Sequence, residues 1–249
     1  MQPLQVLLEL ARHPPVYRRT VGLFERTWDL IEKRSMLAVA AADLDQVVAE
    51  YMQRAVRRID PNGYITDPLP EIRLKISVEA IPHIIYGMCE LAAHLLWIAE
   101  GRFPRSFHKI AKACARSSGD PYDAFKAHVG DLTWYFRARE IRTEWTHFST
   151  SFVGGGLDQP PRIVGKAFRG NDAKTIVQGR FEMETGDLRE VAMAAIGAVD
   201  RIADFVTRAR IVPKLDATEA TKALRGVRDG RFVIEETTMG QVLRELGLA

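Results

Sequence analysis

Apolar residues recur at helical spacing along most of the chain. Residues 3–12 predict a short helix that ends at Pro14-Pro15, because proline cannot continue a helix in its interior. The next apolar row repeats at intervals of 4, 3, 4 and 3 residues and predicts an amphipathic helix that buries it. Its members are Tyr17, Val21, Phe24, Trp28 and Ile31. A further row predicts a third helix, with Leu44, Val47, Val48, Tyr51, Ala55 and Ile59 facing inward.

A proline-rich loop at 60–71 precedes a segment, 76–99, that is apolar on nearly all sides. A helix of that kind lies at the centre of a bundle or in a subunit interface. His83 and His94 lie on it without the spacing of a metal site, and we expect them to be packed core histidines.

The region before residue 130 predicts two shorter helices. Residues 103–116 form a basic one, with Arg105, Lys109, Lys112 and Arg116 exposed. In the next, Asp120 is expected at the N-cap and Pro121 at the first helical position. Over 101–150, nine basic residues stand against five acidic ones, which fits either an anionic partner or a solvated face.

The period changes after Phe152, where Gly154–Gly156 and Pro160-Pro161 interrupt the helical pattern. Alternating residues at 162–168 and 175–183 predict a β-hairpin. A long helix then starts near Thr185 and ends at Pro213. Its predicted stripe is Leu188, Val191, Ala195, Val199, Ile202 and Val206. The C-terminal part predicts a charged helix, a strand at 232–234 and a last segment that begins at Thr238.

Together these elements predict a mostly α protein, a helical bundle with an inserted β-hairpin at about 162–183. We divide it into N-terminal helices packed on the bundle (1–70), a core (71–213) and a C-terminal appendage (214–249).

With 47% hydrophobic and 27% charged residues, the 249-residue chain has a globular composition. Cys89 and Cys114 lack metal-like spacing, which favours a reducing cytoplasm over a disulfide framework. No apolar run reaches ~18 residues and no signal-like N-terminus is present, so we predict neither secretion nor a membrane span.

The stretch with most chemistry is 131–152, DLTWYFRAREIRTEWTHFSTSF. Its apolar row predicts a helix face docked on a core and consists of Trp134, Ala138, Ile141, Trp145 and Phe148. The polar set projects away from this face, with Arg142 at its edge, and consists of Arg139, Glu140, Thr143 and His147. A rigid helix with a dense polar face is suited to present a functional site.

Four residues separate Arg142 from His147 in Arg142-Thr143-Glu144-Trp145-Thr146-His147. This resembles the motif of the HEPN superfamily, which is an arginine, four to six residues, then a histidine. Ile141-Arg142-Thr143 and Trp145-Thr146-His147-Phe148 are similar to the family's aliphatic-Arg-polar and aromatic-small-His-aromatic flanks. Thr143 stands where active members usually carry Asn, Asp or His.

The resemblance implies a HEPN-like core and metal-independent RNA cleavage, in which the ribose 2′-OH attacks the adjacent phosphate. His147 would deprotonate the 2′-OH and Arg142 would stabilise the growing negative charge. Thr143, Glu144 or Glu140 would orient the imidazole, and Arg139 would support RNA binding. No metal or other cofactor is expected. In a regular helix Arg142 and His147 lie about 140° apart. Either the helix distorts near Thr146, the arginine wraps round, or a second subunit completes the site, as the HEPN resemblance favours.

Three interpretations remain open. The first is an endoribonuclease of a toxin–antitoxin or defence system. The second is a HEPN-type homodimer that binds RNA, an antitoxin or a nucleotidyltransferase-type partner without cleaving RNA. The third is a structural helical dimer, in which Arg142 pairs with Glu140, Glu144 or Asp131 in surface ion pairs that each stabilise by ~0.2–1 kcal/mol.

Overall fold

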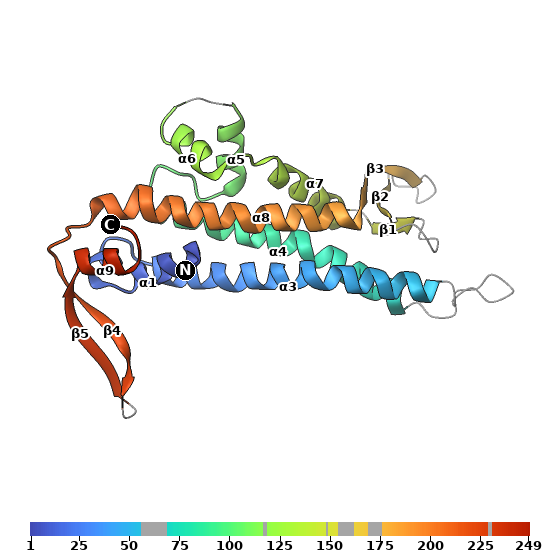
Figure 1. Ribbon diagram of the computed structural model, residues 1–249. Helices are drawn as coiled ribbons and strands as arrows, with labels where there is room; N and C mark the ends of the chain where they lie inside the picture. Colours follow the sequence, from blue (N-terminus) through green and yellow to red (C-terminus); the bar gives the residue numbers. More distant parts are fainter. Residues whose placement is uncertain (56–68, 117–118, 148, 154–161, 169–175, 229–230) are drawn as a thin grey trace. The chain divides into compact units, whose positions relative to one another are not determined.

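A computed structural model describes residues 1–55, 69–116, 119–147, 149–153, 162–168, 176–228 and 231–249. These residues form nine α-helices and two small antiparallel sheets, so the predicted mostly helical class is confirmed (Figure 1). The helices are α1 (Pro3–Ala11), α2 (Pro14–Tyr17), α3 (Leu23–Ala55), α4 (Leu69–Glu100), α5 (Phe107–Arg116), α6 (Tyr122–Val129), α7 (Thr133–His147), α8 (Thr185–Phe205) and α9 (Met239–Glu245). The strands are β1 (Ser149–Val153), β2 (Arg162–Phe168), β3 (Ile176–Glu184), β4 (Ala220–Arg228) and β5 (Arg231–Thr238).

The chain divides into two compact units. Unit 1 comprises Met1–Glu32, Met88–Asp131 and Gly197–Ala249, and unit 2 comprises Lys33–Gly87 and Leu132–Ile196. Both units are therefore built from segments that are distant in the sequence. The three-part division at residues 70 and 213 stays a prediction.

Aromatic side chains form the centre of unit 1. The rings of Phe103, Phe125 and Phe205 lie 5.4–6.3 Å apart in edge-on or tilted arrangements. Beside them, Nε2 of His128 lies 2.9 Å from a carboxylate oxygen of Asp204. These contacts join α6 to the end of α8. After α8 the chain continues as a π-helical segment, Val206–Ile211, and a 3₁₀ turn, Val212–Lys214, so that the helical run ends around Pro213 as predicted.

Unit 2 contains the predicted hairpin. β2 pairs antiparallel with β3, and β1 pairs with the other edge of β2 to give the order β1-β2-β3. β1 corrects the sequence analysis, which continued the helical pattern to residue 152. Serine and threonine compete for backbone hydrogen bonds and, with Phe152 and Val153, favour the extended chain over the helix. The strand at 149–153 therefore replaces the last turn that we expected.

Helix α3 contains most of the predicted second and third helices, whereas Tyr17 belongs to α2, Val21 lies in the turn before α3, and Ile59 lies outside the described residues. The buried face of this region differs from the first predicted row. Tyr17, Val21 and Trp28 are 45%, 71% and 49% exposed, whereas Leu23, Leu30 and Leu37 are at most 1% exposed. Two apolar stripes run along this segment, and the leucine stripe is the one that packs. The helical spacing of apolar residues identifies both stripes but does not show which of them is buried.

Three smaller predictions also need correction. The expected charged helix near 220–228 is strand β4, which pairs with β5. Asp120 does not cap α6, whose N-cap residue is Pro121; the Asp120 carboxylate accepts a hydrogen bond from Arg102 at 2.8 Å. His83 is exposed rather than packed in the core. Thr238 does start the last helix, because its Oγ1 accepts a hydrogen bond from the Gln241 backbone N–H at 3.3 Å.

Helix α4 has the length and composition of a membrane-crossing helix. Half of its most apolar window is buried inside the protein, as in the core helix of a soluble protein. Ile81, Ile85 and Leu95 are at most 1% exposed. Among the residues that the structure describes, α4 is thus the one weak candidate span, and its buried half packs in the protein core.

Candidate functional site

Helix α7 carries the residues that the sequence singled out. Trp134, Ala138 and Ile141 are 8%, 3% and 0% exposed, so the predicted buried row is confirmed over these three positions. The side chains of Trp145 and Phe148, which would continue the row, lie outside the described residues. Docking by this face fixes the direction in which the opposite, polar face of α7 points.

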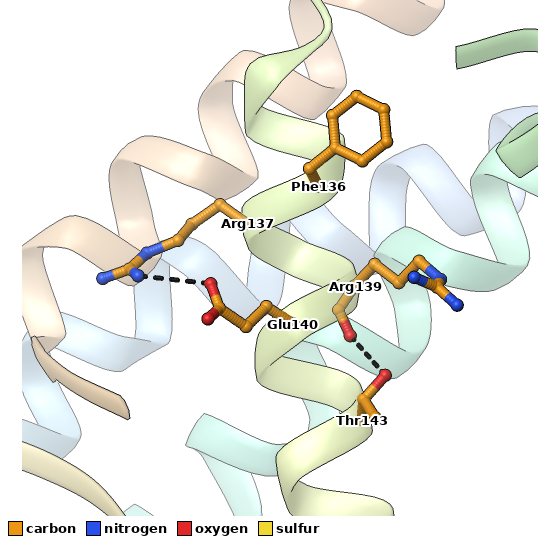
Figure 2. Close-up of a pocket in the computed structure, with 5 residues that line it drawn as sticks. All are labelled: Phe136, Arg137, Arg139, Glu140 and Thr143. Atoms are coloured by element: carbon orange, nitrogen blue, oxygen red, sulfur yellow. Dashed lines mark hydrogen bonds and ion pairs between the residues drawn. The ribbon is translucent and has the colours of Figure 1, made fainter. Parts of the chain in front are cut away.

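The polar face of α7 surrounds a shallow hollow of about 480 Å³ (Figure 2). Arg139, Glu140 and Thr143 are exposed and line the hollow, so the structure brings together three of the predicted residues. Phe136 and Arg137 also line it, and the sequence analysis missed both. Their spacing could have identified them: Phe136 and Arg137 lie four and three residues before Glu140, and residues at these spacings share a helix face.

Two interactions set the side chains around this hollow. Arg137 and Glu140 form an ion pair at 3.5 Å between Nη1 and Oε2. The Thr143 hydroxyl donates a hydrogen bond of 2.8 Å to the Arg139 carbonyl, one turn earlier on the same helix. Figure 2 shows Arg137 and Glu140 extending to one side of α7 and Arg139 to the other. Arg139 therefore presents a cation on the side away from Glu140.

Arg142 has a different setting. It is half-buried, and its guanidinium carbon lies 3.9 Å from the centre of the Tyr86 ring on α4. A guanidinium stacked on an aromatic face is held by cation–π attraction, and its planar group keeps a defined orientation. The prediction that Arg142 sits at the edge of the buried stripe is confirmed, and Tyr86 is a contact that the sequence did not reveal.

Glu144 and His147 belong to α7, but their side chains lie outside the described residues. Helix α7 stays α-helical through His147, its last residue, which argues against the first of the three alternatives, a distortion near Thr146. Two alternatives remain by which Arg142 and His147 could act in one site: the long arginine side chain reorients, or a second subunit completes the site.

Within the residues that the structure describes, no three His, Cys, Asp or Glu side chains are grouped in a way that could bind a metal ion. No family model, no curated protein and no solved structure matches the chain. Functional inference therefore rests on the residues of α7 and the contacts that position them.

Proposed function

We propose that this protein is a HEPN-type, metal-independent endoribonuclease with Arg142 and His147 as its catalytic pair. The observation that carries the proposal is the stacking of Arg142 on Tyr86. Arg142 lies on α7, five residues before His147, which ends that helix. An arginine already held by an aromatic ring loses little conformational freedom when it meets a phosphate. This preorganisation suits a group that must stabilise charge in a transition state.

The proposed reaction needs only these two side chains and the RNA. The His147 imidazole takes the proton of the ribose 2′-OH, whose oxygen attacks the adjacent phosphorus. Arg142 stabilises the pentacoordinate phosphate while the bond to the 5′-oxygen breaks, and that oxygen takes up a proton from solvent water. The products are a 2′,3′-cyclic phosphate and a 5′-hydroxyl. In a homodimer, two motifs would line one cleft and complete each other's site.

The exposed face of α7 supports RNA binding beside this pair. Arg139 extends a guanidinium into solvent next to the hollow, where it can contact backbone phosphates. Such contacts hold RNA without reading its sequence, so target choice would lie elsewhere. A role in a cytoplasmic toxin–antitoxin or defence system belongs to the same proposal.

One observation favours the second candidate, a HEPN-type protein that binds RNA or a protein partner without cleaving. Thr143 replaces the Asn, Asp or His that usually follows the motif arginine, and its hydroxyl hydrogen is donated to the Arg139 carbonyl. That hydrogen is then not available to orient His147. An antitoxin or a nucleotidyltransferase-type protein would be the partner in this case.

Incubation of the purified protein with total RNA in EDTA tests the proposal. We expect fragments that end in 2′,3′-cyclic phosphate, and cleavage by His147→Ala that is slower by ~10²–10⁴-fold, the usual contribution of general base catalysis. Arg142→Lys keeps the charge but loses the planar fork, and it should also cleave poorly. Arg116→Lys makes the same change at an exposed arginine of α5 that has no part in the proposed site, and it should retain cleavage.

Intact RNA with the folded parent protein would contradict the nuclease. RNA binding that weakens with salt and with Arg139→Ala would then support the binding protein. Absence of both cleavage and binding would leave the structural dimer.

A further inference from the structure

The C-terminal hairpin is an exposed two-stranded ribbon in unit 1. β4 and β5 pair along their length and extend away from α9 (Figure 1). Two contacts hold the ribbon: His13 Nδ1 lies 3.1 Å from Thr221 Oγ1 near the base, and Arg225, in the middle of β4, donates two hydrogen bonds of 2.7 and 2.9 Å to Glu245. An isolated two-stranded ribbon is marginally stable in water, so the part beyond these contacts needs further support.

Large apolar side chains beside Arg225 and beyond it toward the tip of the ribbon face solvent. Leu224 and Ile234 stand directly opposite each other and are 57% and 62% exposed. Val227 is 64% exposed and Val233 is 40% exposed. A cross-strand aliphatic pair stabilises a sheet when a neighbour covers it, and here it lies in solvent in the single chain.

The two edges of the ribbon differ. β4 has a bulge at Arg225, where the register shifts between Leu224 and Gly226, and Gly226 has a φ of +143°. A bulge interrupts the regular row of N–H and C=O groups that an added strand requires. β5 carries no bulge over Arg231–Thr238, and no third strand pairs with it among the residues that the structure describes. The edge of β5 is therefore the one suited to receive a strand.

The charges of β5 match those of a second β5 that runs in the opposite direction. The strand begins with Arg231, continues with three apolar residues and then carries Glu235 and Glu236. Glu235 accepts a hydrogen bond of 2.8 Å from Arg225 of its own chain and is 61% exposed, so its carboxylate can also accept from a second arginine. Antiparallel pairing about Val233 places Arg231 of each copy opposite Glu235 of the other. We propose that two copies of this chain associate through their β5 edges, forming a four-stranded antiparallel sheet with Val233 at the two-fold axis.

Symmetry and side-chain alternation select this register. A two-fold axis perpendicular to a sheet keeps every residue on its own face, so opposed residues must be an even number of positions apart. With the axis at Val233, Arg231 meets Glu235. With the axis at Ile234 it would meet Thr237, and with the axis at Phe232 it would meet Val233. Only the first register pairs opposite charges and brings the aliphatic residues of both strands together.

The inference concerns association alone and does not depend on RNA cleavage. It is tested first by the molar mass of the full chain, measured by light scattering over a dilution series. We expect a dimer whose dissociation constant rises about tenfold or more with Arg231→Glu, because two attractive cross-strand pairs become repulsive. Arg231→Glu combined with Glu235→Arg should restore the dimer. Arg244→Glu makes the same charge change at an exposed position of α9 and should leave the dimer unchanged.

A disulfide at the axis tests the register. Val233→Cys should yield a covalent dimer under mild oxidation, because the two Cβ atoms would face each other across the new strand pair. Glu236→Cys is the control: its two copies would be about 20 Å apart at ~3.4 Å per residue, and it should not cross-link. Cys89 and Cys114 are buried and do not interfere.

The proposal is overturned by a folded monomer at all concentrations, or by a dimer that neither Arg231→Glu nor Val233→Cys affects. The second outcome would place the interface on another part of the chain. Circular dichroism of each variant shows that a lost dimer does not result from unfolding.

Discussion

At the scale of single residues, Glu100 is the charge whose removal should cost most. Its carboxylate is 8% exposed at the end of α4, where Arg102 and Arg210 both form ion pairs with it, and Arg210 is only 17% exposed. Removing one member of a buried pair leaves the other charge uncompensated. We expect Glu100→Gln to lower the free energy of unfolding by about 3 kcal/mol, as measured by urea denaturation.

Glu9→Gln is the matched control for this measurement. Glu9 pairs with Arg12 at 2.8 Å, but both side chains are more than 40% exposed, and such a pair stabilises by at most about 1 kcal/mol. If Glu100→Gln and Glu9→Gln lowered the free energy of unfolding equally, burial would not be what strengthens the ion pairs of Glu100 with Arg102 and Arg210.

Residue-scale features were predictable from sequence where they are local. The exposure of Arg139, Glu140 and Thr143 follows from the helical period, which relates residues within two turns. The stacking of Arg142 on Tyr86 joins two helices that are separated by many residues, and no local pattern reports such a contact.

At the scale of elements, His13 connects the N-terminal segment to the hairpin. Its ring contacts Thr221 of β4, and burial, the largest effect, lowers the pKa of His13 below the ordinary value of 6.5. The unfolded chain then binds a proton more readily than the folded chain, so protonation favours unfolding. The contribution to stability is complete above pH 6.5 and is lost as the pH falls from 6.5 toward the lowered pKa.

We therefore expect the melting temperature to fall between about pH 7.5 and about pH 5, and to fall less in His13→Asn. Asparagine can keep a hydrogen bond to Thr221 but does not titrate. Calorimetry at several pH values measures how the melting temperature of each protein changes with pH. Equal changes in the parent and in His13→Asn would exclude His13 as the group that causes the pH dependence.

Elements defined by their own residues were predicted better than elements defined by pairing. The stripe of α8 was identified correctly, since Leu188, Ala195 and Val199 are fully buried. The charged helix that we expected before the strand at 232–234 is not present: residues 220–228 pair with 231–238 and form a strand. A strand depends on a partner, and the partner is not visible in the segment itself.

At the scale of the whole molecule, the two cysteines report on whether the fold is closed. Both thiols are buried, and burial raises the pKa of Cys114 to about 11 and that of Cys89 well above its ordinary value. The thiolate is the reactive form, and at mildly alkaline pH both thiols are protonated and shielded from solvent, so both should be unreactive.

We expect a thiol reagent to label neither cysteine in the native protein and both in guanidinium chloride. Because both cysteines lie in unit 1, labelling that appears in dilute denaturant, before helical circular dichroism is lost, would show that this unit opens without global unfolding.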